Sequence, residues 1–566
     1  MPNSPSYKTK GKIKRSSESS QDVGEDLMSG SEDDLTARPA TKGSFPNGDE
    51  GHVEDFEEQD GLLAGDNASF KPMMLDEGRR RKGWIRILGV PLPKPLLYLL
   101  AIPLILLILS SLPDLSFVIP FTPKHLSTLS NGTHDFYPTV LLISLDGFRP
   151  EYLSSHKDLL PNLLSISTRS NGIRAESMQP VFPSLTFPNH WSLMTGLHPE
   201  SHGIVANNFY DPLFTSHTNA KEGTHEKEAS EPGAQFVYIK EDKSWDANWW
   251  WGEPIWGVVE RMKRRSAVIM WPGPPITKAG ISPSFFVPYR KLAPSEKVKT
   301  IFSYLDHPIS ERPEFIASYF PEIDQAGHKG GPNSKGVNDT LKLCDDMLGE
   351  LFEAIQERNL GNVIDVIIVS DHGMAETSND RMIYLDDILG EDGVNAIEHE
   401  DGWPSVGLRF KAGTDTEYYL NILLEAAEQS NGTFAVYTHD TMPDRWHFSH
   451  GHRIAPIYVV PTIGWAITNH HEHEVLFQGD YQPKGNHGYD NLFPEMQAIF
   501  FSQGPFVNLL KEKAIQAVYE SHDPPILKNF KNLEIFSLVT RLLGLSAIEP
   551  AHNGTIGFWD NYLGSA

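Results

Sequence analysis

The sequence predicts an α/β layered fold with a mostly parallel central sheet and helices on both faces. From Tyr137 onward, short apolar runs alternate with stretches of helical periodicity. Such alternation is typical of parallel strands joined by helices, and sheets of this kind collect ligands at the carboxyl ends of their strands. The strand candidates are 139–145, 266–270, 315–320, 363–370 and 497–501.

The first 94 residues are predicted to form a disordered cytosolic tail, because they are rich in Ser, Gly, Asp and Glu and poor in large apolar side chains. Residues 95–113 follow a basic run, Arg79–Lys82, and are apolar enough for one transmembrane signal-anchor helix. A buried soluble helix is the alternative, but it would lack a polar face. Basic residues on the N-terminal side indicate a type II single-pass membrane protein.

The remainder of the chain is then lumenal or extracellular, at the cell surface or in a secretory or vacuolar compartment. Residues 114–136 are predicted to be a stalk, and 137–566 one catalytic domain with an insertion subdomain at 375–480. Sequons beyond the span predict a glycoprotein; their acceptors are Asn131, Asn338, Asn431 and Asn553.

The bulk composition excludes some classes of function and structure. A formal net charge of -26 argues against a nucleic-acid-coating role, which needs a basic surface. One cysteine, Cys344, allows no disulfide within the chain. The fold must therefore be held by core packing and by bound metal.

Six side chains are candidate metal ligands. Asp146 ends the run 139–145, and the pair Asp371 and His372 ends the run 363–370. A turn at Gly373 would let both members of that pair reach one metal. The others are Asp324, His328 and His487.

Asp324 and His328 are one helical turn apart, but the nearby glycines favour a tight loop over a long helix. Carboxylates and imidazoles together suit zinc. Six such ligands plus a hydroxyl suit two metal ions, which can clamp a phosphoryl group in line.

Thr186 is the candidate for that hydroxyl. Pro188 is well placed at a first helical position, which puts Thr186 at a helix N-terminus, where the dipole favours an alkoxide and an incoming phosphate. Metal coordination can lower the pKa of a hydroxyl enough for attack on phosphorus. A helix-capping threonine is the structural alternative.

The motifs together resemble the ectonucleotide pyrophosphatase/phosphodiesterase family of the alkaline phosphatase superfamily. A single cysteine leaves out the disulfide-rich modules of animal members, so the chain resembles a fungal or yeast-type membrane member. In chain order the motifs are Asp146-Gly-Phe-Arg, Thr186-Phe-Pro-Asn-His, Glu200-Ser-His-Gly-Ile-Val, Asn207 with Tyr210-Asp-Pro212, Trp271-Pro-Gly273, Asp324-Gln-Ala-Gly-His328, Asp371-His-Gly-Met374 and His487-Gly-Tyr-Asp-Asn491.

The resemblance implies an alkaline-phosphatase-like fold with insertions, and a hydrolase that uses two zinc ions per chain. The substrate would be a nucleotide phosphodiester or pyrophosphate, and the product a nucleoside 5′-monophosphate. One zinc would be held by Asp146, Thr186, Asp371 and His372. The other would be held by Asp324, His328 and His487, and would activate water for the second step.

The resemblance also implies roles around the reacting phosphate. Thr186 would form a phosphothreonine, and Asn207 would bind a non-bridging oxygen. Phe187 would stack on one face of the base, and either Phe286 or Tyr289 on the other. A phospholipid head-group phosphodiesterase or phosphatase of the same superfamily remains an alternative, and an inactive surface binding domain a more distant one. The preferred substrate and the oligomeric state stay open.

Overall fold

The computed structural model describes residues 84–87, 90–93, 127–215, 233–510 and 526–563. The predicted membrane span, 95–113, and most of the predicted stalk lie outside these residues. In the described part of the chain, no helix is both long and apolar enough to cross a bilayer. Within the range predicted as a tail, β1 (Trp84–Ile87) and β2 (Val90–Pro93) form an antiparallel hairpin that belongs to a separate compact unit.

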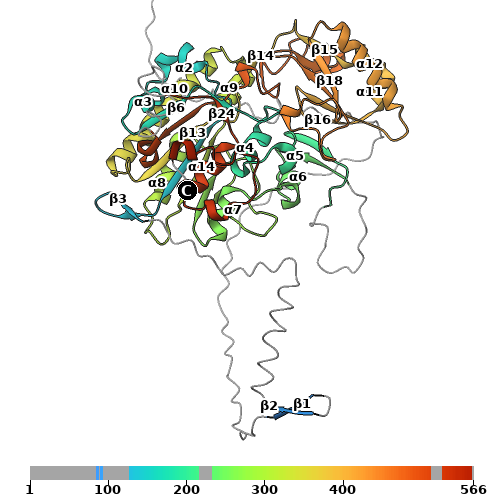
Figure 1. The fold of residues 1–566 in the computed structure, drawn as a ribbon. Helices are drawn as coiled ribbons and strands as arrows, with labels where there is room; N and C mark the ends of the chain where they lie inside the picture. Colours follow the sequence, from blue (N-terminus) through green and yellow to red (C-terminus); the bar gives the residue numbers. More distant parts are fainter. Residues whose placement is uncertain (1–83, 88–89, 94–126, 216–232, 511–525, 564–566) are drawn as a thin grey trace, which may run out of the picture. The chain divides into compact units, whose positions relative to one another are not determined.

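An eight-stranded mixed sheet forms the centre of the unit that contains all described residues from 127 onward (Figure 1). Its five strands on one side run parallel, whereas β22 is antiparallel to both of its neighbours. The order is β11 (Phe285–Val287), β10 (Ser266–Ile269), β12 (Phe315–Phe320), β5 (Thr139–Leu145), β13 (Ile364–Val369), β22 (Phe500–Gln503), β6 (Gly172–Ala175) and β23 (Ile526–Leu527).

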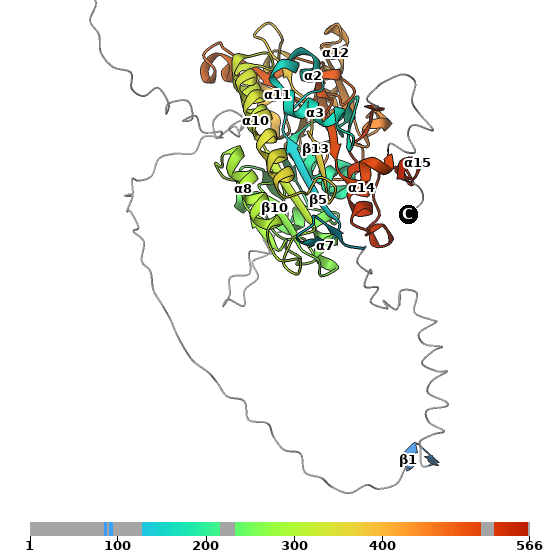
Figure 2. The same ribbon diagram turned by 90° about the vertical axis from the view of Figure 1, so that its left-hand side faces the viewer.

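Helices cover both faces of this sheet, as predicted, and they bury its apolar strands (Figure 2). All seven residues of β5 are buried, which explains why that strand is an unbroken apolar run. One face carries α3 (Pro161–Thr168), α8 (Pro294–Leu305) and α10 (Lys335–Glu357); the other carries α4 (Thr186–Thr195), α7 (Ile255–Arg261) and α14 (Glu534–Leu542).

The preference for a tight loop around Asp324 and His328 was wrong. These residues lie on a helix, α9 (Glu322–Gly330), and Gly331 ends it with φ +84°. Gly327 lies inside the helix, at a point where the helix packs closely on Met374. A Cβ there would come within 2.9 Å of the Met374 Cε. The glycines therefore mark close packing and a helix end, and not a loop.

The range predicted as an insertion contains a four-stranded antiparallel sheet with an apolar core of its own, drawn in orange shades in Figure 1. Two helices, α11 (Leu385–Ala396) and α12 (Thr416–Gln429), pack in this region. The strand order is β16 (Ile397–Asp401), β17 (Val406–Phe410), β19 (Ile457–Pro461) and β18 (Phe434–Thr438).

Short strand pairs lie outside these two larger sheets. Across the base of the insertion, β14 (Ala375–Glu376) pairs with β21 (Gly485–Asn486). The remaining pairs are β3 (Leu129–Ser130) with β4 (Asp135–Phe136), β7 (Met178–Gln179) with β24 (Phe530–Lys531), β8 (Asn208–Asp211) with β9 (Ala234–Val237), and β15 (Met382–Tyr384) with β20 (Ala466–Thr468).

Candidate metal centre

The six predicted ligands gather at one edge of the sheet, where the adjacent strands β12, β5 and β13 end. Asp146 directly follows β5, and the pair Asp371 and His372 follows β13. Helix α9, which carries Asp324 and His328, follows β12. The carboxyl ends of parallel strands meet at one edge, so these side chains converge although they are far apart in sequence.

The first half of the centre consists of Asp146, Asp371, His372 and Thr186, all of which are buried. The His372 Nε2 lies 3.0 Å from Asp371 Oδ2 and 3.4 Å from Asp146 Oδ1. The Thr186 Oγ1 lies 3.2 Å from the same nitrogen. One cation at this point would be within reach of all four side chains.

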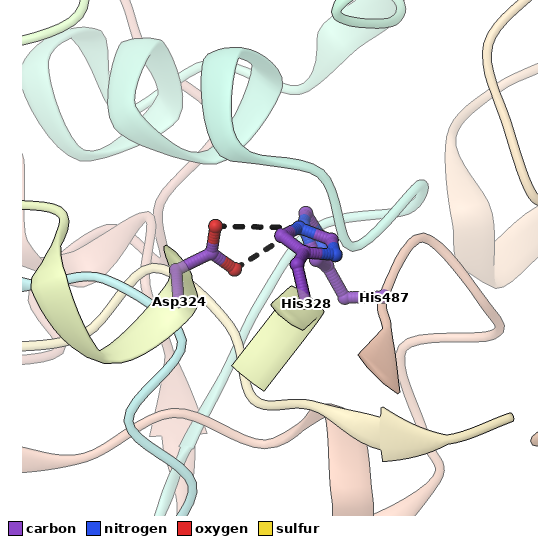
Figure 3. Close-up of side chains that lie close together, drawn as sticks. All are labelled: Asp324, His328 and His487. Atoms are coloured by element: carbon purple, nitrogen blue, oxygen red, sulfur yellow. Dashed lines mark hydrogen bonds and ion pairs between the residues drawn. The ribbon is translucent and has the colours of Figure 1, made fainter. Parts of the chain in front are cut away.

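The second half consists of Asp324, His328 and His487 (Figure 3). The His328 Nε2 lies 3.3 Å from Asp324 Oδ2, and the His487 Nε2 lies 3.4 Å from Asp324 Oδ1. The two Nε2 atoms are 3.1 Å apart. The rings of His487 and His372 stack at 3.6 Å, which brings the two halves side by side.

Backbone carbonyls fix the tautomer of all three histidines. The Nδ1 atoms of His328, His487 and His372 lie 2.9 Å from the carbonyl oxygens of Gly485, Ser184 and Gly373. Each Nδ1 must carry the proton, which leaves a lone pair on each Nε2 facing the cluster. The facing lone pairs of His328 and His487 repel one another unless a cation lies between them.

The carboxylates show the same need for a cation. Asp146 Oδ1 and Asp324 Oδ1 are buried and accept no hydrogen bond from the described residues. Burial, together with the neighbouring Asp371 and Asp324, raises the pKa of Asp146.

An uncompensated buried carboxylate is costly, and a bound cation would relieve the cost. The donor set of carboxylate oxygens, imidazole nitrogens and one hydroxyl fits zinc. The residues present therefore fit a two-metal centre.

Thr186 is the first residue of α4, which follows an extended Leu185. The prediction that Pro188 occupies the first helical position was wrong, because Pro188 is the third residue of α4. It still lies in the first turn, where backbone N–H groups have no partner within the helix. The Phe187 N–H donates to Asn207 Oδ1 at 3.0 Å, so the carboxamide of Asn207 is held beside the start of the helix. This helix end is an anion-binding geometry.

The three aromatic candidates lie in different surroundings. Phe187 is half-buried, with its ring 5.2 Å from that of Tyr238. Phe286 is half-buried on β11, edge-on to Trp245. Tyr289 is 47% exposed, and its hydroxyl accepts a hydrogen bond from Gln325, the neighbour of Asp324, at 3.1 Å. Of the latter two, only Tyr289 is tied to helix α9.

Two side chains that the sequence analysis did not single out as site residues contact the carboxylates. The Tyr319 hydroxyl donates to Asp146 Oδ2, and the His190 Nδ1 lies 3.3 Å from Asp371 Oδ2. Tyr319 is hidden in an apolar strand pattern. His190 belongs to the Thr186-Phe-Pro-Asn-His motif, and its place in that motif was the one available signal.

The layered sheet and the cluster at its carboxyl edge together define an α/β protein with a candidate metal centre of the kind that metal-dependent hydrolases use. Comparisons agree. Residues 140–490 match the family described as Type I phosphodiesterase / nucleotide pyrophosphatase. The fold also matches murine ectonucleotide pyrophosphatase/phosphodiesterase 5 with a TM-score of 0.61 and 28% identity, over 75% of this chain and 99% of that one.

Curated relatives in sequence place the chain in the same family. An uncharacterized pyrophosphatase/phosphodiesterase of Schizosaccharomyces pombe is 37% identical over 433 residues, or 76% of this chain and 81% of that protein. Ectonucleotide pyrophosphatase/phosphodiesterase family member 3 of Rattus norvegicus is 33% identical over 75% of this chain but only 44% of its own length. The chain belongs to the type I phosphodiesterase / nucleotide pyrophosphatase family, which confirms the resemblance, the fold class and the hydrolase class.

Proposed function

We propose that this protein hydrolyses nucleotide phosphodiester or pyrophosphate bonds with two zinc ions and releases a nucleoside 5′-monophosphate. The observation that carries the proposal is Thr186 at the start of α4, with its Oγ1 3.2 Å from His372 Nε2 inside the ligand cluster. A structure of murine ectonucleotide pyrophosphatase/phosphodiesterase 5 supports it: a threonine-to-alanine variant of that protein is described as inactive and in complex with AMP.

One zinc would be held by Asp146, Thr186, Asp371 and His372, and the other by Asp324, His328 and His487. Zinc bound at these residues would stabilise negative charge on the phosphoryl oxygens and lower the pKa of a hydroxyl group or a water molecule. The protein's own part is to hold the ligands dry and rigid, which the buried strand ends and the carbonyl-fixed imidazoles provide.

Thr186 is the nucleophile in this proposal. Its Oγ forms a bond to phosphorus as the bond to the leaving-group oxygen breaks, which gives a phosphothreonine that carries the nucleoside. Water then displaces Oγ and releases the nucleoside 5′-monophosphate. Both displacements are in line, with the attacking and leaving oxygens on opposite sides of the phosphorus.

Asn207 orients the phosphate. Because its Oδ1 accepts the Phe187 N–H, its Nδ2 is the donor left for a non-bridging oxygen. The Thr186 N–H at the start of α4 supplies a further donor for the same charge.

The nucleobase of the substrate stacks between the rings of Phe187 and Tyr289. Tyr289 is preferred over Phe286 because its ring is exposed and its hydroxyl is tied to α9, whereas Phe286 packs on Trp245. Two aromatic faces recognise any base by stacking, so this arrangement favours nucleotides without choosing among them.

The test is a substrate panel with product identification on the wild type and on Thr186→Ala and Thr186→Ser. Thr186→Ala should lose at least about 1,000-fold in hydrolysis of a dinucleoside pyrophosphate while keeping most of its zinc. Thr186→Ser, which retains a hydroxyl, should keep measurable turnover. Undiminished hydrolysis by Thr186→Ala would sink the mechanism, and a product other than the 5′-monophosphate would change the substrate class.

We also propose a type II membrane topology with a glycosylated lumenal or extracellular domain, on the strength of the apolar run at 95–113 and the sequons beyond it. The acceptors differ in access. Asn431 is exposed in a turn with φ +55°, whereas the Asn131 Nδ2 already donates to the Arg358 carbonyl. Peptide mapping after glycosidase treatment should therefore find Asn431 occupied before Asn131.

A further inference from the structure

Tyr319 lies behind the first half of the metal centre. It is the fifth residue of β12, and its register partner on β5 is Ser144. Partners in parallel strands point to the same face of the sheet. Both side chains contact His190 on α4, since the Ser144 Oγ lies 2.9 Å from His190 Nε2 and the Tyr319 ring is edge-on to the imidazole at 4.9 Å. Tyr319 is 6% exposed.

The Tyr319 hydroxyl separates the roles of the two Asp146 oxygens. It donates a hydrogen bond to Oδ2. Oδ1 is left without a hydrogen bond from the described residues and lies 3.4 Å from His372 Nε2, on the side of the cluster. The carboxylate therefore has one oxygen held by the protein and one presented to the ligand position.

This carboxylate needs a donor more than an isolated one would. It shares a buried site with two other acids, and the carboxylates repel one another. The phenol hydroxyl of Tyr319 supplies that donor. A phenylalanine at this position would fill the same space and donate nothing.

The other carboxylate of the first half is approached from the same layer. The His190 Nδ1 lies 3.3 Å from Asp371 Oδ2 and 2.9 Å from the Thr186 carbonyl. Tyr319, His190 and Ser144 thus form a continuous polar layer behind Asp146 and Asp371. The histidines of both halves are oriented by backbone carbonyls, so this layer of side chains concerns the carboxylates of the first half.

We infer that Tyr319 is a positioning residue for the first metal ion: its hydroxyl orients Asp146 so that Oδ1 faces the metal, and its removal weakens binding at that half alone. The inference rests on the proposed zinc function. Second-layer partners of metal ligands commonly affect metal affinity by about 10- to 100-fold. The expected effect is a loss of that size for one of two ions.

The experiment compares Tyr319→Phe with wild type and with Tyr304→Phe. Tyr304 is a half-buried tyrosine on α8 that packs on Phe285, outside the ligand cluster, so its variant controls for the loss of a phenol hydroxyl as such. Each protein is loaded with zinc and titrated with a chelator, and bound zinc per chain is measured at every step. Thermal unfolding of the zinc-free proteins is followed in parallel.

The wild type must first hold two zinc ions; if it does not, the proposed function fails and not this inference. Given two ions, Tyr319→Phe should give up one of them at about 10- to 100-fold lower chelator concentration, with the second retained as in wild type. Tyr304→Phe should match wild type. Retention of both ions by Tyr319→Phe would overturn the inference. So would equal weakening of both ions or a zinc-free protein that no longer unfolds cooperatively, since either would indicate a general structural role.

Discussion

The first half of the metal centre lies on strand ends, whereas the second half lies on a helix and on a loop that returns from beyond the insertion. Asp146 and Asp371 follow adjacent parallel strands, which sheet hydrogen bonds hold in register. His328 and His487 depend on contacts between α9 and that loop, such as the Lys484 N–H that donates to the His328 carbonyl at 2.8 Å. One set of candidate ligands is thus positioned by the sheet, and the other by the contacts that close the base of the insertion.

The halves also differ in charge and support. The first contains two carboxylates and is backed by the side chains of Tyr319 and His190. The second contains one carboxylate and two imidazoles, which backbone carbonyls orient. We therefore expect the two halves to contribute to different steps, with the half that contains Thr186 required for attack.

The largest effects should come from removing one histidine from each half. His372→Ala and His487→Ala should each hold about one zinc fewer and lose at least about 1,000-fold in turnover, since metal stabilisation supplies several kcal/mol. Only His487→Ala should accumulate nucleotide on Thr186, which mass spectrometry of acid-quenched protein would detect. Accumulation of nucleotide in His372→Ala, or its absence from His487→Ala, would contradict the assignment of the two halves to different steps.

Asn207 tests whether the first half also carries the phosphate contacts. Asn207→Ala removes the proposed amide donor and should lower kcat by about 100- to 1,000-fold, with zinc content unchanged. Steady-state kinetics with a dinucleotide would measure the effect, with Asn208→Ala as the neighbouring control. A change confined to KM would instead assign Asn207 to ground-state binding.

Tyr289 tests whether base recognition belongs to the second half, to which Gln325 ties it. Tyr289→Ala should raise KM for a nucleotide substrate by about 10-fold, because one stacking face is worth roughly 1–3 kcal/mol. Phe286→Ala should leave KM nearly unchanged. An arylphosphonate ester that lacks a base should be insensitive to both variants; the opposite ranking of the two aromatic residues would reverse the assignment.

The smallest expected effect concerns Asp365, a half-buried acid at the start of β13, at the end of the strand opposite to the imidazoles. Burial raises the pKa of Asp365 to about 7, against the smaller effect of the Phe506 N–H that donates to it. Between the ordinary pKa and about 7 the folded state binds more protons than the unfolded state, so this residue's contribution to stability is lost as pH rises through that window.

Asp365→Asn should remove this dependence, because the amide oxygen can still accept the Phe506 N–H without ionising. The free energy of unfolding of the variant should exceed that of the wild type by about 1–2 kcal/mol at pH 8 and should equal it at pH 4. The difference is small because the side chain is only partly buried, so solvent screens part of its charge. Urea unfolding of the zinc-free proteins at both pH values would measure it. Parallel pH dependence in both proteins would show that Asp365 is ionised throughout.

The sequence predicted the strands that carry the site because each is a long buried run, as β5 and β13 are. It missed β6, β11 and β23, which have only four, three and two residues and so show no periodicity. Asp146, Asp371 and His372 could be singled out as candidate ligands because they follow buried apolar runs. The sequence missed the role of Tyr319, because only the register of β12 on β5 brings that ring to Asp146.

The strand pair β14–β21 at the base of the insertion determines which parts of the insertion can vary in length. Ala375 pairs with Asn486 and Glu376 with Gly485, and the Thr377 N–H donates to the Lys484 carbonyl at 3.0 Å. The two ends are thus clasped immediately before His487. Lengthening a closed loop adds only about 0.6 kcal/mol per doubling. The segment between the paired ends can therefore lengthen at its exposed turns at a small cost in free energy, whereas Gly402 and Ser405, which hydrogen-bond to Asn208 and Gly488 beside the reaction centre, must keep their places.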